Sequence, residues 1–180
     1  MAKYGFLVDL NLCVSCRACE VACKTWNSVP THRQVFWRRV IDESFGYQEK
    51  VIGWSVSLAC NHCNEAPCVK ACPTGAMTKR TSDGIVLIDQ QKCVGCRYCE
   101  AVCPYGAPQF DPVVRKMSKC TMCVDRLAQD KLPACVETCP TEALQFGLLS
   151  EIDQRGVRQI PRFADPSIAD PSIRFIPKEV

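Results

Sequence analysis

The chain has 180 residues, of which 16 are cysteine, and a formal net charge of +3 from 22 basic and 19 acidic side chains. This near balance of charge gives no indication of a surface for nucleic acid. Cysteine is so frequent that it must dominate the fold, because few conventional apolar residues remain to build a core.

The N-terminal segment predicts a short β-strand. Residues Tyr4 to Leu10 alternate, with Phe6 and Val8 on one face, and lead into a cysteine-rich loop. The segment has neither the apolar run of a signal peptide nor a twin-arginine pair. No apolar stretch in the sequence approaches the ~18 residues that cross a bilayer. We therefore expect a soluble or peripheral protein that does not itself span a membrane, and disulfides explain so many cysteines poorly.

The cysteines fall into four sets of four, with none left over. Two sets have the bacterial ferredoxin pattern C-x2-C-x2-C-x3-C, and the other two are stretched forms, C-x2-C-x4-C-x3-C and C-x2-C-x11-C-x3-C. Three thiolates of such a run reach one cubane, and the fourth points to a neighbouring cluster. Sixteen thiolates would hold four 4Fe–4S cubanes. In chain order the sets are Cys13, Cys16, Cys19 and Cys23; Cys60, Cys63, Cys68 and Cys72; Cys93, Cys96, Cys99 and Cys103; and Cys120, Cys123, Cys135 and Cys139.

Zinc is the competing metal, because paired C-x2-C motifs also build tetrahedral thiolate sites. A third cysteine two residues after the second, present twice, and a Cys-Pro ending, present three times, favour the cubane. A Rieske centre needs two histidine ligands, and the sequence has only His32 and His62. A ligand role for His62 would leave one cysteine without a function, so we expect this side chain beside a cluster or on the surface.

The segments between the cysteine sets predict short strands. The segment 25–59 carries all three tryptophans, which we expect to pack against the cluster modules, and it is strand-like from Val51 to Ala59. Further along, Met77 to Lys79 and Ile85 to Ile88 flank the turn sequence Thr-Ser-Asp-Gly and predict a hairpin. Small residues between ligands, Ser15 and Gly95, suit tight loops around a cluster.

We predict an α+β fold with two bacterial-ferredoxin-like modules. Residues 60–103 form an inner two-cluster module, and residues 1–24 and 104–147 form an outer module that is split in the sequence. Residues 25–59 are an inserted β-rich segment. Residues 148–180 contain four prolines and little periodicity, which predicts an extended C-terminal arm that binds a partner.

The protein resembles the iron–sulfur subunit of membrane-associated molybdopterin oxidoreductases, and most closely that of the anaerobic dimethyl sulfoxide reductase and polysulfide reductase group. The likeness covers about residues 3 to 150. Its cysteine spacing is specific for the superfamily and far less specific for the substrate. The residues that carry it are Tyr4 to Phe6, Cys13 to Lys24, Ser57 to Cys63, Ala66 to Pro73, Lys92 to Cys99, Cys103 to Pro108, and Lys119 with Cys120.

This resemblance implies a non-catalytic subunit of a respiratory oxidoreductase. Four 4Fe–4S clusters would relay electrons between a molybdopterin (Mo or W) catalytic subunit and an integral membrane quinone-binding subunit. Its location would be peripheral on the membrane, on the periplasmic or outer face by co-export with the catalytic subunit, or alternatively on the cytoplasmic face.

The resemblance also implies how the ligands are shared. The cluster 1 set is Cys13, Cys16, Cys19 and Cys139; the cluster 2 set is Cys23, Cys120, Cys123 and Cys135; the cluster 3 set is Cys60, Cys63, Cys68 and Cys103; and the cluster 4 set is Cys72, Cys93, Cys96 and Cys99. Related subunits in which tryptophan replaces one ligand hold a three-iron cluster, and nothing here suggests that variant.

Basic residues lie within two positions of several ligands: Lys24, Lys70, Lys92, Arg97 and Lys119. A cation near a cluster favours its reduced, more negative form and raises its potential. The alternative is that all five are ordinary solvated side chains.

No other chemistry is evident, since dinucleotide, nucleoside triphosphate and nucleophile-elbow motifs are missing from the sequence. Catalysis would therefore belong to a partner. The alternative functions are a soluble polyferredoxin, a zinc-stabilised scaffold, and the electron subunit of a hydrogenase or formate dehydrogenase. Subunits of this last kind often carry a C-terminal membrane helix, which residues 168–180 cannot supply.

Overall fold

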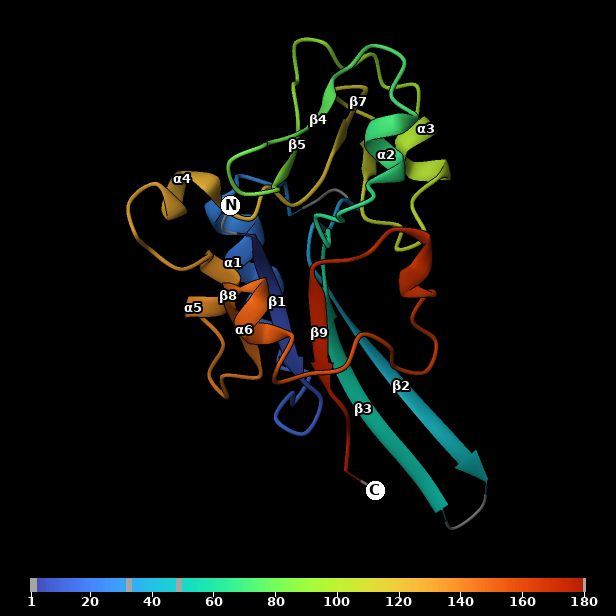
Figure 1. Cartoon of the computed structure of the whole chain (residues 1–180), viewed down its shortest axis with the longest axis vertical. Coiled ribbons are helices and arrows are strands. Elements are labelled where there is room, and N and C mark those ends of the chain that lie inside the picture. The colour runs from blue at the N-terminus through green and yellow to red at the C-terminus, as the bar shows by residue number, and fades with distance from the viewer. Residues whose placement is uncertain (1–2, 32–33, 48–49, 180) are drawn as a thin grey trace.

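A three-stranded sheet joins the two ends of the chain in the computed structural model, which describes residues 3–31, 34–47 and 50–179. Strand β1 (Tyr4–Asp9) lies in the middle, antiparallel to β8 (Leu144–Leu148) and parallel to β9 (Ile173–Ile176) (Figure 1). This confirms the predicted N-terminal strand. Its residues Phe6, Leu7 and Val8 are all buried, because a central strand covered on both faces has no solvent side.

The C-terminal segment is built into this fold, so the prediction of an extended arm at residues 148–180 is wrong in its geometry. After β8 it forms α6 (Leu149–Ile152), the 3-10 helix η1 (Pro166–Ile168) and the edge strand β9. The Phe163 ring packs edge-on against Phe175 at 4.9 Å between centroids. The segment is buried in short separate pieces, so no periodicity marks it in the sequence. Partner binding by its exposed parts stays a prediction.

Short helices carry several of the cysteines inward. Helix α1 (Ala18–Trp26) follows the first loop and places Cys19 and Cys23 one turn apart, where both are buried. It packs against α5 (Ala134–Glu137), which follows α4 (Val124–Leu127). The two ends of the cysteine sequence therefore meet beside the sheet.

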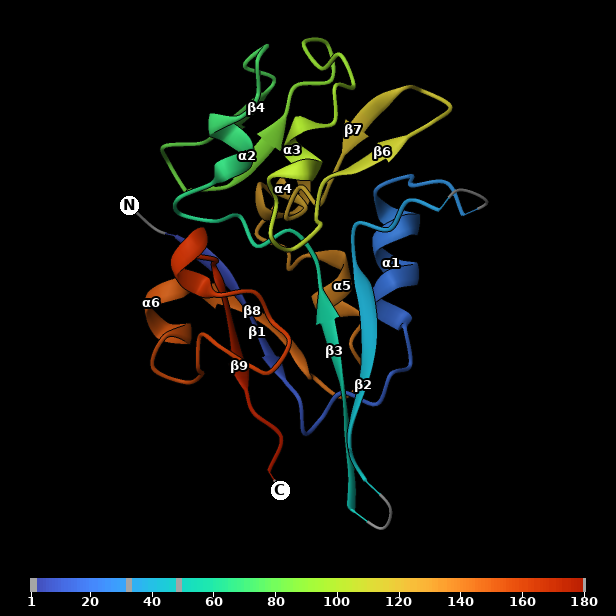
Figure 2. The ribbon, with the colours of Figure 1, turned by 90° about the vertical axis from the view of Figure 1, so that its right-hand side faces the viewer.

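Three hairpins complete the fold. The longest, β2 (Arg39–Tyr47) with β3 (Lys50–Leu58), projects away from the helices and hairpins at the other end of the molecule (Figures 1 and 2). The predicted hairpin at residues 77–88 is confirmed as β4 (Met77–Lys79) and β5 (Val86–Ile88). It lies with α2 (Pro67–Lys70) and α3 (Tyr98–Ala101).

The third hairpin, β6 (Gln109–Asp111) with β7 (Lys116–Ser118), is placed differently from the prediction. Its Met117 is buried in one apolar cluster with Met77 and Val86. The hairpin belongs in sequence to the predicted outer module, but it packs against the core of the inner one.

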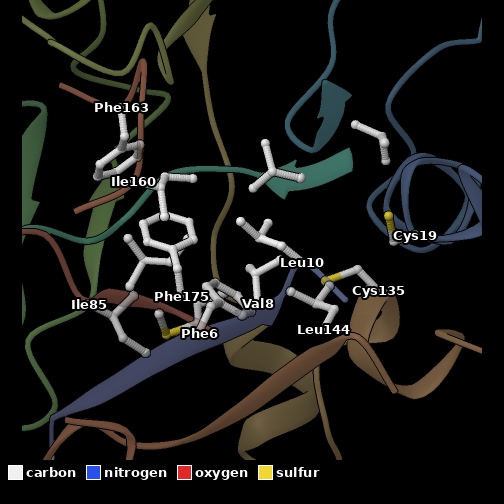
Figure 3. Close-up of a cluster of buried hydrophobic side chains, with 14 residues drawn as sticks. Phe6, Val8, Leu10, Cys19, Ile85, Cys135, Leu144, Ile160, Phe163 and Phe175 are labelled. Carbon is white, nitrogen blue, oxygen red and sulfur yellow. The ribbon is translucent and has the colours of Figure 1, made fainter. Parts of the chain in front are cut away.

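The main core lies between the sheet and the cysteine-bearing helices. Figure 3 shows Phe6, Val8 and Phe175 from the sheet close to one another, with Cys19 and Cys135 at the edge of the same cluster. The cysteines are thus part of the core, in agreement with the small number of other apolar residues.

Two of the three tryptophans pack as predicted. Trp37 lies against the cluster of buried residues that contains Cys60 and Cys120, and Trp54 lies against the main core. Trp26 is largely exposed, and its indole N–H donates to Asp125 at 2.7 Å.

Candidate functional site

Cysteines from the two ends of the sequence line one cavity beside the sheet. Burial is the main reason why the pKa of the Cys13 thiol is raised, and repulsion from the other three thiols adds to it, so the four lie close together. Val8, Val40 and Leu144 close the cavity with apolar surface. The lining cysteines are Cys13, Cys16, Cys19 and Cys139, the cluster 1 set.

A second cavity has the same character at the other end of the molecule. Met77, Ile88 and Met117 supply its apolar lining, and its cysteines are Cys72, Cys93, Cys96 and Cys99, the cluster 4 set. Burial and then repulsion from the neighbouring thiols raise the pKa of the Cys99 thiol to about 11. The backbone N–H of Met77 donates to Cys72 Sγ at 3.4 Å, a contact of the kind that stabilises thiolate ligands.

The remaining two sets are buried more deeply. Burial, followed by repulsion from the thiols of the cluster 2 set, raises the pKa of Cys23. Burial, followed by repulsion from the thiols of the cluster 3 set, raises the pKa of Cys63. In both sets only Cys103 is partly exposed. The structure therefore brings each of the four sets together.

One backbone feature repeats in all four cysteine runs. The residue before the second cysteine has a positive φ of 56° at Ser15, 42° at His62, 69° at Gly95 and 59° at Met122. This left-handed turn curls the loop, so that successive thiols can face a common space. The sequence signalled the turn at Ser15 and Gly95, which are small, but not at His62 and Met122.

Gly95 shows how tight such a loop is. A Cβ at this position would lie 2.3 Å from the carbonyl oxygen of Arg115, far inside van der Waals contact. With φ at +69°, both the conformation and the space require glycine.

The donor set fits iron–sulfur clusters. All 16 cysteines are free, which rules out the disulfide alternative in this structure. Sulfur ligands grouped in fours around apolar cavities, with backbone N–H groups beside them, are what 4Fe–4S cubanes require. The N–H of Met122 approaches Cys120 Sγ at 3.3 Å in the same way.

His62 is fully buried, so the alternative of a surface side chain is wrong. Its Nδ1 accepts a hydrogen bond from the N–H of Val86 at 3.0 Å, and burial holds its pKa well below the usual range. His62 is therefore a neutral side chain beside Cys63. His32 lies outside the described residues.

The five cations near the ligands divide into two kinds. Lys24 and Lys119 are buried, and the Lys119 ammonium donates to the carbonyls of Val86 and Cys120. The alternative of ordinary solvated side chains holds for the other three, which are exposed and form the ion pairs Lys70–Glu65, Lys92–Asp89 and Arg97–Glu100.

Sequence reasoning missed one cation, Arg38, which is the largest fully buried side chain of the described residues. The sequence shows two adjacent arginines, Arg38 and Arg39, and nothing in it distinguishes the buried one from an exposed one. Only the fold places Arg38 among the cysteines of the outer module.

In the part of the protein that the structure describes, helices are too short and too polar for any of them to cross a bilayer.

Comparison with known proteins agrees with this arrangement. Two models of a 4Fe–4S dicluster domain match, one over residues 53–149 and the other over residues 12–77. Both describe iron–sulfur rather than zinc sites. Together they extend over all four cysteine runs.

Several relatives are similar over most of their length. The iron–sulfur subunit of the anaerobic dimethyl sulfoxide reductase of Escherichia coli (strain K12) is 40% identical, covering 92% of this chain and 87% of the relative. The corresponding subunit of the polysulfide reductase of Wolinella succinogenes is 42% identical (83% and 78%), and the thiosulfate reductase electron transfer subunit of Salmonella typhi is 43% identical (87% and 82%). The protein belongs to the family of iron–sulfur subunits of the dimethyl sulfoxide, polysulfide and thiosulfate reductases.

Proposed function

We propose that this protein is the electron-transfer subunit of a dimethyl sulfoxide or polysulfide reductase-like complex. It relays electrons through four 4Fe–4S clusters between a molybdopterin catalytic subunit and an integral membrane quinone-binding subunit. The observation that carries the proposal is the convergence of 16 free thiols into four groups of four. The clusters supply one-electron chemistry when bound, and the protein's own residues bind them, separate them and exclude water.

The order of the four sets supports a linear relay. Burial is the main cause of the raised thiol pKa values, and thiols of neighbouring sets add to it in three places. Cys135 acts on Cys19, Cys60 on Cys120, and Cys99 on Cys68. These pairs connect the cluster 1 set to the cluster 2 set, then to the cluster 3 set, and finally to the cluster 4 set.

The two ends of this row reach the surface, which supports electron entry and exit there. Cys16 in the cluster 1 set and Cys96 in the cluster 4 set are the two exposed cysteines of the sixteen. Exposed apolar side chains stand close to each in sequence, Val14 beside the first and Val94 and Tyr98 beside the second. Apolar surface of this kind is typical of contacts between subunits.

Metal analysis tests the cluster content. The purified protein, prepared anaerobically, should contain iron and acid-labile sulfide near sixteen of each, since each cubane has four iron and four sulfide ions. A preparation with zinc and no labile sulfide would contradict the proposal.

Isolation of the native complex tests the partners. An affinity tag on this protein should retain a large subunit that contains molybdopterin and an integral membrane subunit that holds quinone. A stable monomer that purifies alone would favour a diffusing polyferredoxin, and a large subunit without molybdopterin would favour a hydrogenase-like complex.

The proposed location is the membrane periphery, on the outer face. Clusters are inserted in the cytoplasm, so the subunit would cross the membrane folded and together with its catalytic partner. Protease treatment should then degrade this protein in intact spheroplasts. Protection until the cells are lysed would place it on the cytoplasmic face.

A further inference from the structure

Arg38 precedes β2 and carries its guanidinium into the interior, where the side chain is 2% exposed. The guanidinium lies over the ring of Phe6, with Cζ 4.6 Å from the ring centroid. Among the described residues, no carboxylate forms an ion pair with it. A buried charge without a counter-ion is strongly unfavourable, so the neighbours of this cation must compensate it.

Those neighbours are cysteines of two different sets. Burial lowers the pKa of Arg38, but the negative charge available on nearby thiolates outweighs it and the pKa is raised above its ordinary range. In order of strength the thiolates are Cys135, Cys120, Cys19 and Cys23. Cys19 belongs to the cluster 1 set and the other three belong to the cluster 2 set, so the guanidinium lies between the two.

The hydrogen bonds of the guanidinium point the same way. One Nη donates to the Ser57 carbonyl at 3.3 Å and to Ser57 Oγ at 3.1 Å, and that hydroxyl lies 3.2 Å from Cys19 Sγ. Nε and the second Nη are buried with no hydrogen-bond partner among the described residues. Buried donors of a charged group need acceptors, and cluster sulfur is the acceptor that this environment offers.

We propose that Arg38 is a positioning residue shared by clusters 1 and 2, whose fixed positive charge raises the reduction potentials of both. This inference rests on the proposed function and deepens it. An oxidised cubane with four thiolates carries a charge of about −2, and its reduced form is more negative. A permanent cation between two such clusters stabilises the reduced form of each, and burial away from water keeps that effect unscreened.

The two buried lysines are placed differently. Lys24 stacks on the Phe36 ring at 3.8 Å and donates to the carbonyl of Pro30, while Lys119 is held by carbonyls near the cluster 3 set. Arg97, beside Cys96, is exposed and paired with Glu100 at 2.7 Å. Arg97 is therefore the matched control, an arginine near a cluster whose charge is screened and neutralised.

The experiment is an EPR-monitored redox titration of the complete complex containing Arg38→Gln, Arg38→Lys or Arg97→Gln, with iron and labile sulfide measured on each sample. We expect Arg38→Gln to lower the midpoint potentials of two of the four clusters and to leave the other two in place. Arg38→Lys should move both potentials back toward the wild-type values, and Arg97→Gln should leave all four unchanged. Unchanged potentials in an iron-replete Arg38→Gln complex would overturn the proposal.

Loss of clusters is informative as well. If Arg38→Gln lacks two clusters and Arg38→Lys retains all four, the charge is required to hold them, as proposed. If both variants lose the same clusters, shape rather than charge matters and the proposal fails. A wild-type complex without labile sulfide would instead overturn the proposed function, and that result is seen before any variant is made.

Discussion

The two exposed ends of the proposed relay use one loop design in different surroundings. Each loop has the spacing C-x2-C-x2-C, a left-handed residue before its second cysteine, and a second left-handed residue after it, at Arg17 or Arg97. Each of these arginines pairs with a glutamate three residues on, at 3.5 Å in the Arg17–Glu20 pair and 2.7 Å in the Arg97–Glu100 pair. The ligand loops are therefore repeated almost feature by feature.

The difference lies in what surrounds each loop. The cluster 4 set comes from one stretch of sequence, whereas the cluster 1 set needs Cys139 from the other end of the chain. The β2–β3 hairpin adds polar groups to the cluster 1 loop only: Asp42 accepts from Ser15 at 2.6 Å and from Arg17 at 3.0 Å. The inserted segment thus gives one end of the molecule an environment that the other end lacks, while the ligands stay the same.

Loss of the distant ligand is expected to have the largest effect. Cys139→Ser should remove or alter the proposed cluster 1, although Cys139 lies far from Cys13 in sequence, because both line one cavity. The other three clusters should keep their EPR signals. A spectrum altered only in the cluster of Cys120 and Cys123 would refute the ligand exchange.

A matched change at the other end completes this test. Cys72→Ser should alter the proposed cluster 4 alone, since Cys72 lines the cavity of Cys93, Cys96 and Cys99. If both serine variants lost the same signal, the two cavities would not hold separate clusters.

Removing an aromatic ring from the sheet should destabilise the split module first. Phe175 is fully buried in β9, and truncation of such a ring to alanine costs about 3–5 kcal/mol. We expect Phe175→Ala to lower the unfolding temperature and to release cluster 1 before cluster 4 on heating. Met77→Ala, in the core of the other cavity, is the control and should reverse that order.

The tight turn of the cluster 4 loop should be less tolerant than its counterpart. Gly95→Ala places a Cβ against the Arg115 carbonyl and holds alanine at positive φ, a strain of about 1–3 kcal/mol or more. Ser15→Ala keeps a residue that already has a side chain and loses one hydrogen bond to Asp42, worth about 1 kcal/mol. Thermal unfolding and iron retention should therefore fall further in Gly95→Ala, and equal losses would count against the steric argument.

The sequence was most informative where a local pattern sets the chemistry. Cysteine spacing predicted four sets of four, and alternation with a turn motif predicted the first strand and the β4–β5 hairpin, because all of these depend on residues close in sequence. Spacing could not reveal that Phe163 and Phe175 complete the main core, since that packing joins the two ends of the chain. It also could not distinguish buried Arg38 from its neighbour Arg39, because burial is decided by distant segments.

The smallest predicted effect isolates the polar environment of cluster 1. Ser57 Oγ touches both Cys19 Sγ and the Arg38 guanidinium, so Ser57→Ala removes one hydrogen bond, worth about 1 kcal/mol of stability, without removing a charge. A hydrogen bond to ligand sulfur stabilises the reduced cluster, so the variant should lower the potential of cluster 1 and leave cluster 4 unchanged. The control is Thr74→Ala, whose hydroxyl lies 3.7 Å from Cys72 Sγ at an exposed position; it should have less effect, because water replaces the lost contact. A larger shift in Thr74→Ala than in Ser57→Ala, measured by redox titration, would show that buried polar groups from the inserted hairpin do not distinguish the two ends.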